Sequence, residues 1–368
     1  MRRVVLLDAQ IKRYRVPFLR QLAAALAPHD ISFVVGYSGP TATDHERADT
    51  IEIEPELGRE LPIATFLNGR VVVQPAWRLV RDADLVIIGQ ANGLIFNYAL
   101  LALSRLGVTR VAYWGHGYNH QAPRSGISEW IKRKLINRVD GWFPYTPEVA
   151  RYLVEHGVPE AKITTIYNTI DVVELRAAIA QVDRAATRAS LGIAPGSRIA
   201  IYCGALVPEK QIAFMIESAI VIRTHIPDFE LVIVGAGRER ARIDALAQPF
   251  VHAVGPSFGA ERARYFAIAD LCLLPAHAGL AVVDAFAAGL PVVTTDHLGH
   301  GPELEYLTPF NSRTTAFTIA SYAEAIAGVL ASPAQLVEMK AAARHAADQL
   351  SMQRMVDAFV TGILRCLA

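Results

Sequence analysis

The sequence is poor in cysteine, in net charge and in long apolar runs, and each shortage argues against a class of protein. Its 368 residues contain three cysteines, Cys203, Cys272 and Cys366, at spacings that match no metal site. We therefore expect free, buried thiols in a reducing cytosol. The 36 basic and 35 acidic residues nearly balance, which argues against a nucleic-acid binder that works through bulk charge.

Long apolar runs are also missing. The most lipid-like stretch, LIFNYALLAL at residues 94–103, is about half as long as a membrane-spanning helix needs to be. The N-terminal MRRVVLLDAQ begins as a strand without a long apolar core, so we expect no secretory signal. The mean hydropathy of +0.27 permits association with a membrane surface without requiring it.

The chain does contain short apolar, β-branched runs that alternate with helix-period segments throughout. This alternation predicts an α/β fold with parallel sheets covered on both faces. The length predicts two domains, which we expect to be doubly wound, Rossmann-like and facing a cleft. The pattern breaks near residues 168–188, so we expect domains at 1–171 and 172–350, with 351–368 a helix returning to the first. The expected strands are 4–7, 31–35, 85–88, 108–113, 141–145, 163–167, 199–203, 231–234, 251–254, 271–274 and 292–294.

The most informative stretch covers residues 270–302. It predicts a strand, a turn, a helix that begins near Gly279, a second strand and a polar glycine loop. Such turns lie at the carboxyl ends of parallel strands, where ligands bind, and free N–H groups at a helix start suit a sugar-nucleotide diphosphate. Asp284 on the helix can accept hydrogen bonds from ribose hydroxyls, and His277 lies in the turn. The alternative is an ordinary βαβ unit.

Two other strand–turn–helix segments carry candidate residues. In residues 201–220, Pro208 suits a first helical turn, and Lys210 lies where an ammonium group can neutralise a leaving diphosphate; the alternative is a solvated surface lysine. In residues 231–240, Gly235 and Gly237 follow a strand. The third glycine of a dinucleotide fingerprint is absent, so this indication of a nucleotide contact is weak.

The first half offers three candidates for binding or proton transfer. His116, between two glycines at a strand end, can contact a sugar hydroxyl or carry a proton; a histidine held by the loop backbone is the alternative. Tyr14 and Arg15 lie in a polar loop placed to meet an acceptor or to gate the cleft. Asp82 and Asp84 form an Asp-x-Asp pair, but they precede a strand while ligands gather at the other end, so we predict no metal site.

Residues 127–139 (ISEWIKRKLINRV) predict a helix with an apolar side and a basic face. Such a helix can lie on an anionic membrane surface. The alternative is a helix that packs on the core and exposes its basic face to solvent.

At this point the sequence resembles the GT-B glycosyltransferases of family 4, over essentially its whole length and most strongly from residue 201 to 304. GALVPEKQ at 204–211 is similar to the family's glycine–arginine–lysine stretch, and residues 275–293 to its donor motif. GPEL at 301–304 follows, and YNTID at 167–171 is similar to the end of the family's first domain.

Two positions depart from the family pattern. The first glutamate of the donor motif is Ala276 here, and the arginine beside the phosphates is Ala205. Lys210 is kept, and the second glutamate is Asp284. His277 is the nearest candidate to replace the missing glutamate.

The resemblance implies metal-independent transfer, with retained configuration, from a UDP or GDP sugar to a glycan or lipid-linked acceptor in cell-envelope polysaccharide synthesis such as that of O-antigen. It implies no cofactor and a cytoplasmic place, peripheral at the inner face of the membrane. His116 would contact the transferred sugar, and the acceptor would lie on the first domain. The residues implied to bind the donor are Gly204, Lys210, Gly235, Gly237, His277, Gly279, Leu280, Ala281 and Asp284.

Two alternatives stay open. A non-catalytic GT-B protein that binds a carbohydrate or a partner would account for Ala276 and Ala205. A nucleotide-sugar epimerase on the same fold would be expected to carry more carboxylates in the cleft.

Overall fold

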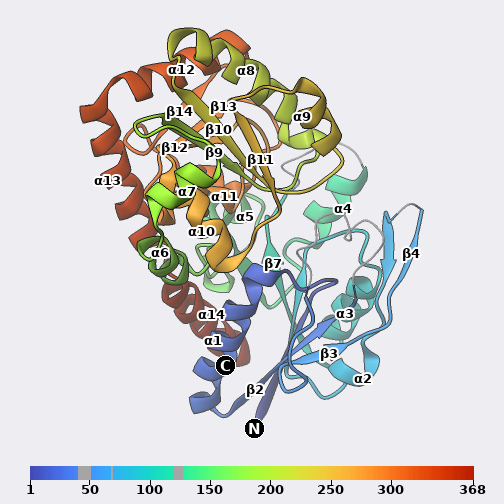
Figure 1. Cartoon of the computed structure of the whole chain (residues 1–368). Helices are drawn as coiled ribbons and strands as arrows, with labels where there is room; N and C mark the ends of the chain where they lie inside the picture. Colours follow the sequence, from blue (N-terminus) through green and yellow to red (C-terminus); the bar gives the residue numbers. More distant parts are fainter. Residues whose placement is uncertain (40–50, 68, 119–126) are drawn as a thin grey trace. The chain divides into compact units, whose positions relative to one another are not determined.

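The computed structural model describes residues 1–39, 51–67, 69–118 and 127–368 (Figure 1). It divides into two compact units, unit 1 with residues 1–168 and 352–368, and unit 2 with residues 169–351. The sequence placed the first division at residue 171. Each unit has a six-stranded parallel sheet, so the prediction of two doubly wound α/β domains is confirmed.

The sheet of unit 1 has the order β3-β2-β1-β6-β7-β8. Alternate residues of β1 point to opposite faces: Val4 and Leu6 join one core cluster, and Val5 and Leu7 join the other. Both faces are therefore covered, as the continuous apolar strands predicted. The strands are β1 (Arg2–Leu7), β2 (Ile31–Tyr37), β3 (Gly58–Glu60), β6 (Leu85–Gly89), β7 (Arg110–Gly115) and β8 (Gly141–Pro144).

Helices from both ends of the chain cover one face of this sheet, where α1 (Val16–Leu26) packs against α14 (Met352–Leu367). The opposite face is covered by α2 (Trp77–Val80), α3 (Phe96–Arg105) and α5 (Pro147–Glu155). A short antiparallel pair, β4 (Ala64–Phe66) and β5 (Val71–Val73), forms a separate sheet. Residues 163–167, predicted as a strand, lie along β8, where the N–H groups of Thr164 and Ile166 donate to the carbonyl oxygens of Trp142 and Pro144. They form an isolated bridge, between Ile163 and Trp142, rather than a strand, so the strand prediction there was wrong.

The sheet of unit 2 has the order β11-β10-β9-β12-β13-β14. The strand order reverses between β9 and β12, which pair directly at Ala200 and Leu271. The crevice outside the carboxyl ends of the strands at such a reversal is the usual ligand site of open α/β sheets. The strands are β9 (Arg198–Cys203), β10 (Phe229–Val234), β11 (Val251–Gly255), β12 (Leu271–Leu274), β13 (Val292–Thr295) and β14 (Ser312–Thr315).

Helices cover both faces of this second sheet as well. Figure 1 shows α8 (Ile212–His225) beside α12 (Ile319–Ala331), and α6 (Val172–Ala180) beside α10 (Gly259–Ile268). The Ala-rich stretch after residue 171 is two helices, because the carboxylates of Asp171 and Asp183 each cap a separate helix start. The remaining helices are α7 (Arg184–Ser190), α9 (Arg240–Leu246), α11 (Ala281–Ala287) and α13 (Pro333–Gln349).

The contact between α14 and the sheet of unit 1 gives a stability prediction. Phe359 is fully buried and stacks on Phe143, with ring centroids 4.6 Å apart. Replacing Phe359 by alanine should lower the free energy of unfolding by about 3–5 kcal/mol, because the ring leaves a cavity. All four tryptophans lie in unit 1, so tryptophan fluorescence during urea unfolding follows this unit alone. Thr361→Ala, at an exposed position of α14, should change stability by no more than about 0.5 kcal/mol; equal urea midpoints for the two variants would contradict this packing.

Candidate functional site

An ammonium group joins the two loops that flank the strand reversal of unit 2. Lys210 ends a short 3-10 segment (Pro208–Lys210) after β9, and its Nζ donates a hydrogen bond to the carbonyl oxygen of His277, in the loop after β12. Left-handed Gln211 then turns the chain into α8. The sequence prediction that Lys210 lies at the carboxyl end of this strand agrees with the geometry.

The loop that Lys210 holds leads into α11. That helix begins at Ala281 with Leu280 as its N-cap, slightly later than the predicted start near Gly279. Within the described part of the chain, no acceptor is recorded for the N–H groups of Gly279, Leu280 and Ala281. The Lys210 ammonium thus contacts the loop that carries these donors, an arrangement that favours an anion.

Three histidines surround this loop. His300 is buried, accepts a hydrogen bond at Nδ1 from the Ala278 N–H (3.0 Å) and contacts the Thr295 carbonyl oxygen at Nε2 (3.1 Å). The loops after β12 and β13 are therefore joined through one imidazole. The rings of His277 and His297 lie 5.9 Å apart. His277 has a left-handed backbone with φ of 47°, and a Cβ at Gly299 would lie 2.7 Å from its Nε2, so only glycine fits there without a shift.

Burial and positive charge both act on these imidazoles. Burial lowers the pKa of His277, and Lys210 and His297 lower it further. Burial also lowers the pKa of His300 to about 4, despite the contact with Thr295 that opposes the shift. Because nearby cations disfavour a further positive charge, the same place favours a negative one.

Asp284 is almost fully buried on α11, where Arg262 of α10 lies 2.9 Å from its Oδ1. Burial raises the pKa of Asp284, and Arg262 acts in the opposite direction. The sequence analysis missed Arg262, because it lies inside a helix with no motif around it. The proposed ribose contact of Asp284 stays a prediction, now for a carboxylate that forms an ion pair with Arg262.

The glycines after β9 and β10 have a structural reason to be glycine. Gly235 and Gly237 have φ of 157° and 148°, and a Cβ on them would lie 1.9 Å from the Gly204 carbonyl oxygen and 2.3 Å from that of Leu206. The two loops therefore pack backbone against backbone. This packing accounts for Gly235 and Gly237 without a nucleotide, and their donor contacts, like that of Gly204, stay predictions.

In unit 1, Arg15 is turned inward. Its Nη1 pairs with Asp8, its Nη2 donates to the Tyr145 hydroxyl (3.0 Å), and the guanidinium lies 4.4 Å from the Trp114 ring centre. Burial opposes its charge, but Tyr14, Tyr145 and Asp8 more than offset this, so the pKa of Arg15 is raised. Arg15 therefore has partners inside unit 1, and the acceptor contacts expected for Arg15 and Tyr14 stay predictions.

His116 lies on the other side of the same cluster. Its exposed ring packs edge-on against Tyr145, with centroids 4.4 Å apart. Arg15, Tyr145 and His116 thus come together at the carboxyl ends of β1, β8 and β7. Asp84 instead accepts a hydrogen bond from the Arg3 N–H at 2.6 Å, at the opposite end of the sheet. That position agrees with the reasoning that set the Asp82–Asp84 pair aside as a metal site.

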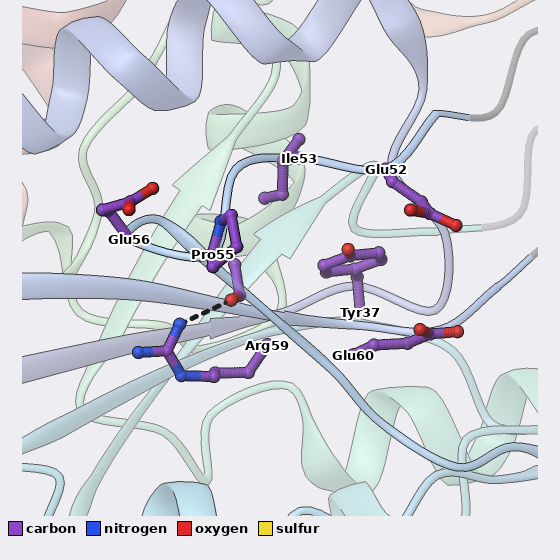
Figure 2. Close-up of a pocket in the computed structure, with 8 residues that line it drawn as sticks. Tyr37, Glu52, Ile53, Pro55, Glu56, Arg59 and Glu60 are labelled. Carbon is purple, nitrogen blue, oxygen red and sulfur yellow. Dashed lines mark hydrogen bonds between the residues drawn. The ribbon is translucent and has the colours of Figure 1, made fainter.

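A pocket of about 650 Å³ opens beside β2 and β3 (Figure 2). No sequence pattern indicated this pocket, because a loop and a three-residue strand build it. None of its lining residues has a buried polar atom without a partner, within the described residues, so we assign it no ligand. The pocket is lined by Tyr37, Glu52, Ile53, Pro55, Glu56, Gly58, Arg59 and Glu60.

The predicted basic helix is α4 (Ile127–Leu135), shorter than expected because residues 136–139 leave the helix. Ile136 and Val139 are buried in the core of unit 1, and Trp130 is 60% exposed. Much of the apolar side is therefore used for packing. Over the described ranges, no helix is long and apolar enough to cross a membrane, and no group of histidine, cysteine and acidic side chains is placed to hold a metal ion.

The contacts of His300 with the loops after β12 and β13 predict that stability depends on pH. Its folded pKa of about 4 lies below the ordinary value of 6.5, so the unfolded chain binds the proton first. The free energy of unfolding should therefore fall between about pH 6.5 and pH 4, by up to about 3 kcal/mol from this group. Hydrogen exchange of β12 and β13 measures it. His300→Gln should flatten the slope in this window, whereas His225→Gln, at the exposed end of α8, should not; equal slopes in all three proteins would contradict the assignment.

Comparison with known families places a match on each half of the chain. The model described as Glycosyltransferase Family 4 matches residues 16–174, and the model described as Glycosyl transferases group 1 matches residues 197–332. The D-inositol 3-phosphate glycosyltransferase of Mycolicibacterium gilvum is 27% identical over 252 residues, which cover 62% of this chain and 54% of that protein. The enzyme of the same name from Nocardia farcinica is 29% identical over 48% of this chain and 42% of its own length. The chain thus spans about half the length of the curated relatives it matches.

Solved structures share the whole fold. Sucrose-phosphate synthase from Thermosynechococcus elongatus has a TM-score of 0.71 at 19% identity, with 99% of this chain and 98% of that chain covered. Anabaena HepE in complex with UDP has a TM-score of 0.71 at 17% identity, with 99% and 100% covered. A UDP-N-acetylglucosamine 2-epimerase, described as putative, from Listeria monocytogenes reaches 0.67 at 16%, with 98% and 96% covered. With a family match on each half and this two-sheet architecture, the chain belongs to the GT-B glycosyltransferases of the family 4 type.

Proposed function

We propose that the protein transfers a sugar from a nucleoside diphosphate donor to a hydroxyl of a glycan or lipid-linked acceptor, with retained anomeric configuration and without a metal ion. Unit 2 binds the donor and unit 1 the acceptor. The bond from the sugar's anomeric carbon to the diphosphate breaks, and a bond to the acceptor oxygen forms on the same face. The hydroxyl proton passes to the leaving phosphate.

One observation carries this proposal: the Lys210 ammonium is fixed against the loop that presents the N–H groups of Gly279, Leu280 and Ala281. A departing diphosphate gains negative charge, and donors already in place stabilise that charge without reorganisation. Burial is the main cause of the lowered pKa values of His277 and His300, and the Lys210 ammonium lowers both further; an anion would offset that nearby positive charge. UDP is bound by the fold neighbour HepE, which supports a nucleotide at this kind of site.

Asp284 and His116 have separate tasks in this proposal. Arg262 helps to keep the buried Asp284 carboxylate ionised, the form that accepts hydrogen bonds from both ribose hydroxyls. His116, exposed beside Tyr145, contacts the transferred sugar. The base, the sugar and a role in cell-envelope or O-antigen synthesis are further proposals that rest on the family resemblance alone.

A panel of nucleotide sugars tests the reaction class. Release of UDP or GDP that requires an acceptor would support a transferase, and NMR of the product's anomeric proton would test retention. A new nucleotide sugar formed without an acceptor would show an epimerase, a class whose fold this chain shares. Nucleotide binding with no turnover of any donor would favour the non-catalytic alternative that Ala276 and Ala205 suggest.

Lys210→Ala should lower kcat by about two to three orders of magnitude, because it removes the cation beside the leaving diphosphate. Steady-state kinetics with the donor identified by the panel measures this. Arg184→Gln also removes one positive charge, at an exposed position at the start of α7, and should leave kcat unchanged. A Lys210→Ala enzyme with full activity would remove the leaving-group role, whatever the donor.

A further inference from the structure

The β4–β5 hairpin of unit 1 exposes large apolar side chains. All three residues of β4 are exposed, and β5 is only half-buried. Phe66 is 55% exposed and Leu67 is 73% exposed. Unlike scattered surface hydrophobes, which need no explanation, these two side chains are adjacent and belong to a pair of strands with no third strand hydrogen-bonded along β4 among the described residues.

Two more exposed hydrophobes lie on segments that adjoin the hairpin. The segment after β6 runs along β5, where the Val72 N–H donates to the Gly93 carbonyl oxygen (2.7 Å) and the Ile95 N–H donates to the Val72 carbonyl oxygen (3.0 Å). Ile95 is 42% exposed and Trp77 is 52% exposed. The Trp77 ring packs edge-on against Phe96 at 4.7 Å, beside Ile95 in the chain. We call Phe66, Leu67, Trp77 and Ile95 the hairpin patch.

The base of the hairpin is fixed to the carboxyl edge of the unit 1 sheet. Gln74, directly after β5, is buried, and its Nε2 donates to the Asp8 carbonyl oxygen (3.2 Å) and to the Ser38 hydroxyl (2.8 Å). Asp8 and Ser38 directly follow β1 and β2. The hairpin patch is therefore held at a defined place beside the Asp8–Arg15 cluster.

The charge around the patch selects its occupant. Residues 61–81 contain three arginines and no acidic residue; Arg81 pairs with Asp82 directly after this segment (3.0 Å), which leaves Arg70 and Arg78. Arg70 and Arg78 are exposed, and no ion pair is recorded for either within the described part of the chain. A two-fold contact between copies would bring like charges together. Exposed aromatic and aliphatic side chains beside arginines match an anionic lipid surface instead.

We propose that the hairpin patch docks the protein on an anionic lipid bilayer, with Phe66, Leu67, Trp77 and Ile95 entering the interface and Arg70 and Arg78 contacting lipid phosphates. This replaces α4 as the principal membrane contact expected from the sequence. In α4, Lys132 is partly buried, which lowers its pKa, and the segment that follows packs into the core through Ile136 and Val139.

Vesicle flotation tests the proposal with the full chain. Wild type should float with phosphatidylcholine vesicles that contain phosphatidylglycerol, and less with phosphatidylcholine alone or at high salt. Phe66→Ser with Leu67→Ser should lower the partition coefficient at least about tenfold, because the protein loses two apolar side chains that would enter the bilayer. Arg70→Gln and Arg78→Gln should each lower it about fivefold.

Matched variants separate this patch from others. Leu106→Ser with Val108→Ser removes an apolar pair of similar exposure, 75% and 61%, elsewhere on unit 1, and should float like wild type. Trp130→Ser tests α4 and should change flotation little. Vesicles should shift the tryptophan emission of wild type to the blue, and Trp77→Phe should abolish most of that shift.

Three results would overturn the proposal. They are no flotation of wild type, flotation of the Phe66/Leu67 variant as strong as that of wild type, and a wild-type dimer in sedimentation that is monomeric in this variant. Circular dichroism checks that each variant is folded. Calorimetry of UDP or GDP binding without lipid tests the proposed donor site of unit 2 independently of membrane docking. Failure of nucleotide binding would count against the proposed reaction, and failure of flotation against the docking surface.

Discussion

Unit 2 depends on one charge-assisted hydrogen bond, from the Lys210 ammonium to the His277 carbonyl oxygen. The strand order reverses between β9 and β12, so the loops after these strands turn to opposite sides of the sheet and leave a crevice between them. Lys210 crosses that crevice. The same ammonium adds to the effect of burial in lowering the pKa of His277. It is bonded to the loop before α11, where no acceptor is recorded among the described residues for the N–H groups of Gly279, Leu280 and Ala281. A single cation thus holds the loop in place and makes the crevice favourable for an anion. The structural role and the proposed chemical role therefore belong to the same side chain.

The two departures from the family pattern compensate each other in charge. Ala276 stands where the family carries a glutamate, and Ala205 where it carries an arginine, so one negative and one positive group are both missing. Ala276 is 1% exposed and belongs to the packed core. Ala205 is half-buried, and its carbonyl oxygen accepts a hydrogen bond from the buried Tyr202 hydroxyl at 2.8 Å. With both groups missing, Lys210 is the cation bonded to this loop, and the nearby His277 and His300 have lowered pKa values, mainly because they are buried.

The sequence could predict the sheets, the strand-end position of Lys210 and the segment that forms α11, because these follow from apolar periodicity and from turn chemistry. It could not predict contacts between distant side chains. Nothing near Arg262 indicates that it faces Asp284, and the two hydrogen-bonding partners of His300 lie on different loops. The sequence could not predict that the Arg15 side chain points inward, because an arginine in a loop is usually solvated. Only the fold brings Asp8, Trp114 and Tyr145 around it. Three-residue strands such as β3, β4 and β5 are too short to show a period, so the pocket of Figure 2 and the hairpin gave no signal.

The carboxyl edge of unit 1 reverses the usual distribution of polar and apolar groups. The guanidinium of Arg15 is turned inward and contacts Asp8 and Tyr145 there, while Phe66, Leu67 and Trp77 are turned outward. Water would favour the opposite for both groups. The buried arginine has local compensation in Asp8, Tyr145 and the Trp114 ring, but the described residues offer none for the hairpin patch. Because Gln74 ties the hairpin to the same strand ends as Asp8, the exposed patch cannot move away without disturbing that edge. Together with Arg70 and Arg78, the patch matches an anionic, apolar-backed surface, which is a partner that satisfies both kinds of group.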